Sequence, residues 1–291
     1  MQTTLITPTY APDGARVRLL CRTLDELTVG WDEHWLVIDR RDRDVFSDLA
    51  GPRRRLVFKE DVLPAWLHPP LIGRRWWLSS RSLPVRGWIV QQLVKLSMAE
   101  VGVSGALVFA DSDVAFIRPF DFSGLADSSG RLRLFAGPRS VEAQADRRHR
   151  TWYRVAKELF AVTDPEYATH EYISQLVTWR VDVLQAMTRA LSEATGCDWR
   201  VALARRLDFS EYILYGVFSE YALGAERAGH RLEGHELCYC SWHHRVRDAG
   251  QVRAFVESVP AAYSAALIQS NLGIAPSEYE QLILAALDRT A

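Results

Sequence analysis

The chain has 291 residues and a mass of 33.1 kDa, with 48% hydrophobic and 24% charged residues, the composition of an ordinary globular protein. Its formal net charge of −1 provides no global field that would attract nucleic acid or an anionic membrane. The four cysteines do not suggest a disulfide framework, and we see neither a signal-peptide pattern nor an apolar run that spans a bilayer, so we expect a cytoplasmic protein with reduced thiols.

Predicted strands and helices alternate over the first part of the chain. Apolar stretches predict strands at residues 3–10, 33–40, 54–61 and 105–113. Apolar residues at helical spacing predict a helix over residues 15–28 and a second over residues 85–102, the latter with Ile89, Leu93, Leu96 and Ala99 on one face. This alternation predicts parallel βαβ units and therefore an α/β sheet covered by helices on both faces.

The second part of the chain has a less regular order. We expect strands within residues 130–140, 172–180 and 235–244, and helices within residues 142–162, 181–196, 209–227, 253–259 and 279–289. No linker rich in Gly or Pro divides the sequence. We therefore expect a single domain over residues 1–291, with a nucleotide-type half (about 1–120), a substrate half (about 121–250) and C-terminal helices (about 251–291).

Polar residues follow several of the predicted strands. The segment Thr7–Tyr10 ends the first strand, Asp39 ends the second, and Asp111–Asp113 follows the strand at 105–110. Ligands of open α/β sheets bind beyond the carboxyl ends of the strands. Separate parts of the sequence therefore indicate one binding site at this rim.

The D-x-D formed by Asp111 and Asp113 lies in the stretch "GALVFADSDVAFIRPFDF". Carboxylate oxygens are ligands for Mg²⁺ or Mn²⁺, and such a pair leaves coordination positions for a diphosphate. A capping or turn pair is the simpler alternative. A haloacid-dehalogenase phosphatase is disfavoured, because its motif lies on the first strand and has Thr or Val where this sequence has Ala115.

Three segments resemble a known family. "FADSDVAFIRPF" resembles the D-x-D segment of nucleotide-sugar glycosyltransferases with the GT-A fold, and "GWIVQQLVKL" is similar to the helix that precedes it. "FSEYILYGVFSEY" resembles the acceptor-side helix of bacterial polysaccharide and natural-product glycosyltransferases. The resemblance covers roughly residues 1–245. It implies a GT-A-like fold, a Rossmann-like mixed sheet flanked by helices, and transfer of a sugar from a nucleoside-diphosphate sugar to a hydroxyl acceptor.

The resemblance also implies roles for individual residues. Asp113, with Asp111 directly or through water, would bind Mn²⁺ or Mg²⁺ at the diphosphate. A further group would bind the rest of the donor: Thr7, Pro8, Thr9 and Tyr10 around the base and ribose, Asp39 as an acceptor from the base or ribose, Gln92 and Lys95 facing the cleft, and Ser112 near the ribose.

The resemblance implies a third metal ligand from a late strand. "CYCSWHH" offers His243, with His244 as the second choice. The sequence departs from the family here, because "RVRDAG" replaces a Gly/Lys diphosphate loop, and Arg245 or Arg247 would take over that function.

A base on the acceptor side would remove the proton of the acceptor hydroxyl. Glu211 is the first candidate, followed by Asp208 and Glu171. The alternative for Glu211 is a purely structural position in the first turn of a helix capped by Ser210. Inversion and retention of the anomeric configuration both remain open.

Two other stretches have several interpretations. "RRWWLSSRSLPVRGW" interleaves basic and aromatic residues, but the balanced net charge argues against nucleic acid. Packing of at least two of Trp76, Trp77 and Trp88 is the simpler interpretation, and stacking on sugar rings the alternative. "HELCYC" has the wrong cysteine spacing for structural zinc.

Two other functions are alternatives to a glycosyltransferase. The first is a homologue that binds a nucleotide sugar without turnover. The second, a sugar-phosphate nucleotidyltransferase, is disfavoured because "ITPTYAPDGARVR" has one Gly and lacks a Gly-rich triphosphate signature.

Overall fold

The computed structural model describes residues 1–70, 73, 75–164, 167–206, 208–241, 246 and 248–287. At its centre lies a five-stranded sheet in the order β14–β8–β1–β3–β4. Its strands are β1 (Thr3–Pro8), β3 (Glu33–Ile38), β4 (Arg54–Phe58), β8 (Ala106–Ala110) and β14 (Leu176–Arg180). The first four are parallel and β14 is antiparallel to β8. The predicted α/β sheet with parallel βαβ units is confirmed.

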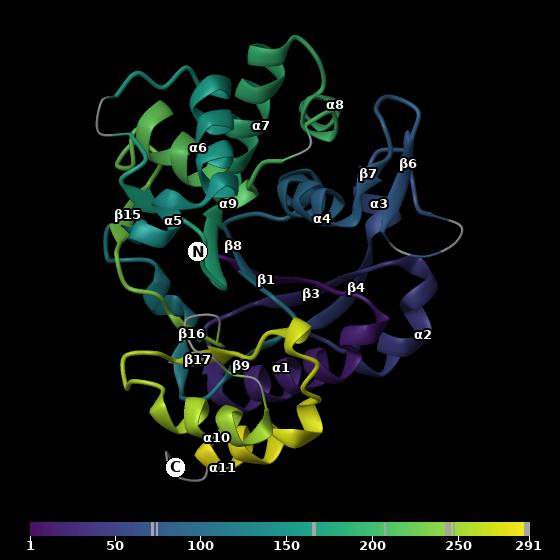
Figure 1. Cartoon of the computed structure of the whole chain (residues 1–291), viewed down its shortest axis with the longest axis vertical. Helices are drawn as coiled ribbons and strands as arrows, with labels where there is room; N and C mark the ends of the chain where they lie inside the picture. The colour runs from purple at the N-terminus through teal and green to yellow at the C-terminus, as the bar shows by residue number, and fades with distance from the viewer. Residues whose placement is uncertain are drawn as a thin grey trace.

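Shorter strands and the helices surround this sheet (Figure 1). The other strands are β2 (Thr28–Val29), β5 (Leu67–His68), β6 (Trp76–Ser79), β7 (Val85–Arg86), β9 (Val114–Phe116), β10 (Phe120–Asp121), β11 (Leu132–Phe135), β12 (Gly137–Pro138), β13 (His170–Glu171), β15 (His230–Glu233), β16 (Cys238–Cys240) and β17 (Ala265–Leu267). The α-helices are α1 (Gly14–Leu27), α2 (Arg43–Phe46), α3 (Lys59–Val62), α4 (Gly87–Ser97), α5 (Val141–Ala145), α6 (Arg147–Leu159), α7 (Val181–Thr195), α8 (Trp199–Ala204), α9 (Glu211–Val217), α10 (Ala249–Ser258) and α11 (Glu280–Leu287). Among the described helices, none is long and apolar enough to cross a membrane.

Alternating side chains of β1 enter two different cores. Ile6 packs in the core that contains Leu93 of α4, and Leu5 packs in the core that contains Leu20 of α1. Successive residues of a strand face opposite sides of the sheet, so one apolar strand supports helices on both faces. Figure 1 shows α4 and α1 on opposite sides of the sheet. The strand ends between these helices are thereby held in fixed positions.

The second half differs in part from the expected elements. The helix expected over 209–227 ends as an α-helix at Val217 and continues as a π-helical turn over Phe218–Ala222. The C-terminal region contains β17 between its helices, where only helices were expected, and β17 pairs with β16 and β9. These pairings join residues far apart in the sequence, so local periodicity does not predict them.

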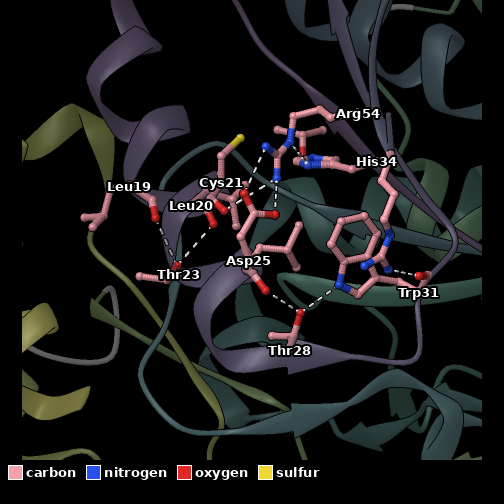
Figure 2. Close-up of polar contacts among 12 residues, drawn as sticks. Leu19, Leu20, Cys21, Thr23, Asp25, Thr28, Trp31, His34 and Arg54 are labelled. Carbon is pink, nitrogen blue, oxygen red and sulfur yellow. Dashed lines mark hydrogen bonds and ion pairs between the residues drawn. The ribbon is translucent and has the colours of Figure 1, made fainter. Parts of the chain in front are cut away.

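Arg54 of β4 links the buried His34 of the sheet to α1 (Figure 2). Arg54 donates from Nε to Nδ1 of His34 at 3.0 Å and forms an ion pair with Asp25 of α1 at 2.7 Å. Because Nδ1 accepts this hydrogen bond, the ring proton lies on Nε2, which donates to Oγ1 of Thr7 at 2.9 Å. Burial, with a smaller effect of the Arg54 charge, lowers the pKa of His34 to about 3.

Candidate functional site

A cleft of about 800 Å³ lies beyond the carboxyl ends of β1, β3 and β8. All three strand ends contribute side chains to it, as the position of the polar residues in the sequence predicts. Its lining consists of Pro8, Thr9, Tyr10, Asp13, Asp39, Lys59, Arg75, Trp77, Arg86, Gly87, Trp88, Val90, Gln91, Asp111, Ser112, Asp113 and Ser270. The structure therefore brings together seven of the residues chosen from the sequence, namely Pro8, Thr9, Tyr10, Asp39, Asp111, Ser112 and Asp113.

One end of the cleft combines a carboxylate, a lysine and a hydroxyl. Asp39 and Lys59 form an ion pair of 3.2 Å, and Nζ of Lys59 also donates to the carbonyl of Thr9 at 3.1 Å. The buried Oγ1 of Thr9 has no hydrogen-bond partner among the described residues. Asp39 and Lys59 thus present a charged acceptor and a charged donor to the cleft.

The other end of the cleft is acidic. Asp113 accepts a hydrogen bond from the backbone N–H of Ser270 at 3.0 Å, and Asp13 accepts one from Oγ of Ser112 at 3.1 Å. Burial, reinforced by the nearby charge of Asp111, raises the pKa of Asp113 to about 7. Burial also raises the pKa of Asp13. Carboxylates this close together repel one another when they are ionised, and a bound cation would relieve that repulsion.

The acidic end fits a divalent cation in its donor chemistry. Carboxylate oxygens from Asp111 and Asp113 are hard ligands of the kind that Mg²⁺ and Mn²⁺ prefer. Within the described ranges no group of three or more His, Cys, Asp or Glu residues is arranged to hold a metal. Two carboxylates leave coordination positions of such a cation open for a diphosphate. The expected third ligand His243, like His244, Arg245 and Arg247, lies outside the described residues.

A buried ion-pair network lies beside the acidic end. Nζ of Lys95 is 3.4 Å from Oδ1 of Asp111, 3.1 Å from Oε1 of Glu211 and 2.6 Å from the hydroxyl of Tyr212. Burial opposes the charge of Lys95, but these groups hold its pKa well above the ordinary value. Gln92 joins the network because its Oε1 accepts the backbone N–H of Glu211 at 3.0 Å. The network thus joins α4 and α9 to the D-x-D.

Several predicted site residues do not line the cleft. Thr7 is fully buried and is bonded to His34. Gln92 and Lys95 are 2% and 3% exposed and lie in the buried network. Both were expected to face the cleft, but the apolar side of α4 turns them inward, and the neighbour Gln91 lines the cleft instead.

None of the three candidate bases lines the cleft. Glu211 is 5% exposed and paired with Lys95. Asp208 accepts a hydrogen bond from Nε1 of Trp152 at 2.6 Å, and Glu171 lies 3.2 Å from Nδ1 of His149. The geometry therefore gives Glu211 a structural partner within the network.

Some lining residues were missed in the sequence. Asp13 follows the first predicted strand by a few residues, and Lys59 lies near the end of the strand predicted over residues 54–61 and directly follows β4 (Arg54–Phe58), so the same rim argument extends to them. Ser270 carried no local signal, because its contact with Asp113 spans 157 positions of the chain. Of the three tryptophans, Trp77 is 4% exposed, while Trp76 and Trp88 are 41% and 38% exposed. The ring of Trp88 lies 5.8 Å from that of Trp152, so Trp77 and Trp88 both pack against the protein.

Comparison with known proteins identifies the fold. A family model described as "Family of unknown function (DUF6492)" matches residues 2–285. No curated protein sequence matches the chain significantly. A crystal structure of the galactosyltransferase LgtC in complex with donor and acceptor sugar analogues aligns with a TM-score of 0.51 and 11% identity, over 99% of this chain and 96% of that chain.

A structure of an active-site mutant of LgtC aligns similarly, with a TM-score of 0.51 and 12% identity over 97% of this chain and 95% of that chain. At such low identity the likeness concerns the fold. The expected GT-A-like arrangement, with a mostly parallel central sheet flanked by helices, is confirmed.

Proposed function

The chain belongs to this family of unknown function, DUF6492, and we propose that it is a metal-dependent glycosyltransferase that moves a sugar from a nucleoside-diphosphate sugar to a hydroxyl acceptor. One observation carries the proposal. Asp111, Ser112 and Asp113 share a cleft with Thr9 and Asp39, at the strand ends of a GT-A-like sheet.

The nucleoside would occupy the end of the cleft formed by Thr9, Asp39 and Lys59. There Asp39 would accept N–H or O–H hydrogens, and Lys59 would donate to carbonyl oxygens. A charged donor beside a charged acceptor can form hydrogen bonds with the edge of a base or with the hydroxyls of a ribose. The ion pair holds both groups in place before the ligand binds.

The diphosphate would lie toward the acidic end, where Asp111 and Asp113 would hold Mn²⁺ or Mg²⁺. When bound, the cation neutralises charge on the departing nucleoside diphosphate. Arg75 and Arg86 also line the cleft and supply positive charge and hydrogen-bond donors for phosphate oxygens. The buried Nζ of Lys95 lies 3.4 Å from Oδ1 of Asp111 and holds this carboxylate in position.

We keep Glu211, Asp208 and Glu171 as the candidates for the base that removes the proton of the acceptor hydroxyl. Glu211 is nearest to the D-x-D through Lys95, and it would act on an acceptor after its ion pair with Lys95 opens. As placed here, Glu211 positions Lys95 and Asp111. A retaining reaction, in which the leaving phosphate takes the proton, needs no base in this position.

The test is a thermal-shift panel of UDP, GDP, TDP and CDP, each with and without Mn²⁺. A ligand at 100 times its dissociation constant stabilises the fold by about 2.7 kcal/mol. We expect one nucleotide to stabilise the wild type in the presence of Mn²⁺, and Asp113→Asn to lose that shift. Asp44→Asn, at an exposed position outside the cleft, is the matched control. Equal shifts in wild type and Asp113→Asn, or no shift with any nucleotide, would contradict the proposal.

A second measurement tests turnover. Release of the nucleoside diphosphate from the nucleotide sugar, measured by a coupled assay with simple sugar acceptors or water, should require the divalent cation. Nucleotide binding without any such release under all acceptors tried would favour the non-catalytic homologue.

A further inference from the structure

The hairpin of β6 and β7 exposes large apolar side chains. Trp76, Leu78 and Leu83 are 41%, 52% and 77% exposed. In β6 the side chains of Trp76 and Leu78 point outward, while Trp77 between them is buried, as strand alternation requires. Leu83 lies in the turn between the strands. Figure 1 shows the hairpin projecting beyond α4 and next to α8.

Arginines surround these apolar side chains. Arg81 is exposed in the turn, the guanidinium of Arg86 lies 5.5 Å from the ring centroid of Trp76, and Arg205 of the neighbouring helix end donates to the carbonyl of Arg81 at 3.2 Å. A groove of about 220 Å³ runs between the hairpin and the end of α8. It is lined by Trp76, Leu83, Pro84, Val85, Arg86, Ile89, Ala204, Arg205 and Arg206.

The sequence around the hairpin lacks acidic residues. No Asp or Glu occurs between Asp61 and Glu100, although the whole chain has 36 acidic residues. The near-neutral total charge therefore conceals a local excess of positive charge. A net charge near zero excludes a global attraction to anionic surfaces but allows a local one at this hairpin.

We propose that the β6–β7 hairpin, with Trp76, Leu78 and Leu83 ringed by Arg81, Arg86 and Arg205, docks the protein on the surface of an anionic lipid bilayer. Tryptophan prefers the boundary between headgroups and acyl chains. Leucine at a protruding turn adds apolar area that the bilayer removes from water. Basic residues near an anionic surface add electrostatic attraction, which salt screens.

A bilayer fits these features better than a folded partner does. The apolar side chains lie on β6, the middle strand of the small β5–β6–β7 sheet, and on the turn after it. The arginines lie near them, where phosphate headgroups would surround an inserted tip. The docked hairpin would also place the cleft beside the membrane, because Trp77, between Trp76 and Leu78, lines the cleft. The inference does not depend on the proposed function.

The test is flotation of the purified protein with vesicles of phosphatidylcholine alone and of phosphatidylcholine with one third phosphatidylglycerol. We expect binding to the anionic vesicles, its loss at high salt, and a fall of about tenfold or more in the partition coefficient for Trp76→Ser combined with Leu83→Ser. Val141→Ser, at a 78% exposed valine remote in sequence, is the matched control and should bind as the wild type does.

Arg81→Gln combined with Arg205→Gln should also weaken binding to the anionic vesicles, which separates the charge from the apolar contribution. Thermal unfolding and the nucleotide thermal shift of the serine variant should equal those of the wild type, so that failure of docking and failure of the proposed function are distinguishable. The proposal is overturned if the wild type does not float with anionic vesicles, if the serine variant floats equally well, or if size-exclusion chromatography shows that these residues instead join two copies of the chain.

Discussion

His34 is kept neutral by its surroundings, and its proton position is set by Arg54 and Thr7. Its native pKa of about 3 lies below the value near 6.5 expected in the unfolded chain. The unfolded state therefore takes up a proton as the pH falls through 6.5, while the native state does not. The stability due to this histidine is complete above pH 6.5 and is lost progressively toward pH 3.

We expect His34→Gln to remove this part of the acid sensitivity, because glutamine does not titrate and still offers a donor and an acceptor. Between pH 7 and pH 5 the wild type should lose about 2 kcal/mol more of its unfolding free energy than the variant does. Urea unfolding at the two pH values measures this difference. The same loss in both proteins would show that His34 is protonated without cost.

Gly216 allows a close approach between α9 and Tyr172. A Cβ at this position would lie 2.2 Å from Cγ of the tyrosine ring. Tyr172 is 1% exposed and donates a hydrogen bond to Glu220 at 2.6 Å, so the ring has little room to move.

Gly216→Ala should therefore lower the unfolding free energy by about 1–3 kcal/mol. Gly124→Ala is the control, since a Cβ there meets nothing within 4 Å. Denaturant unfolding compares the two, and equal stabilities would mean that Tyr172 moves aside at little cost.

At the scale of elements, the contact between α4 and α9 depends on charge as well as on apolar packing. Lys95 of α4 meets Glu211 of α9 at 3.1 Å, and both are nearly fully buried. Removing one partner leaves the other charge buried without compensation. Removing both is far less costly, because an apolar or neutral pair needs no counter-charge.

Lys95→Met should accordingly destabilise the protein by about 3–5 kcal/mol, and adding Glu211→Gln should recover a large part of that loss. A double-mutant cycle from denaturant unfolding measures the coupling. If the two changes have additive effects on the unfolding free energy, Lys95 is not coupled to Glu211, and Asp111 is its only acidic partner in the network. Nucleotide thermal shifts on the same variants would then report how far the network positions the D-x-D.

At the scale of the whole molecule, the C-terminal segment packs against the N-terminal half of the chain at the cleft. The backbone N–H of Ser270 donates to Asp113 at 3.0 Å, and that of Ile268 donates to the carbonyl of Asp113 at 3.3 Å. Arg16 at the start of α1 donates to the carbonyl of Ile274 at 2.8 Å. The C-terminal segment therefore holds the residue that we propose as a metal ligand.

Binding of Mn²⁺ and nucleotide should slow amide hydrogen exchange at Ile268 and Ser270 as well as around residues 111–113. The reason is that local opening of the C-terminal segment would free Asp113 and weaken the site, so a ligand suppresses that opening. Hydrogen exchange with and without the ligand measures this. Protection restricted to the first part of the chain would show that the C-terminal segment opens independently of the site.

The sequence alone determined the framework of this protein. Four parallel strands, α1 and α4 follow from local apolar periodicity, and the polar residues at the strand ends predicted the rim where Asp39, Asp111 and Asp113 meet. These features are predictable because a strand or helix has a fixed period and parallel strands have their carboxyl ends on one side.

Only the tertiary structure decided which side chains face the cleft. Gln92 and Lys95 belong to the buried network, and Ser270 reaches Asp113 from the far end of the sequence. The composition does not predict the exposed surface of the β6–β7 hairpin either. Net charge is a sum over the whole chain, whereas a docking surface depends on where the charged and apolar side chains lie. Periodicity says which face of an element is apolar, but the depth of each polar side chain depends on what packs over it.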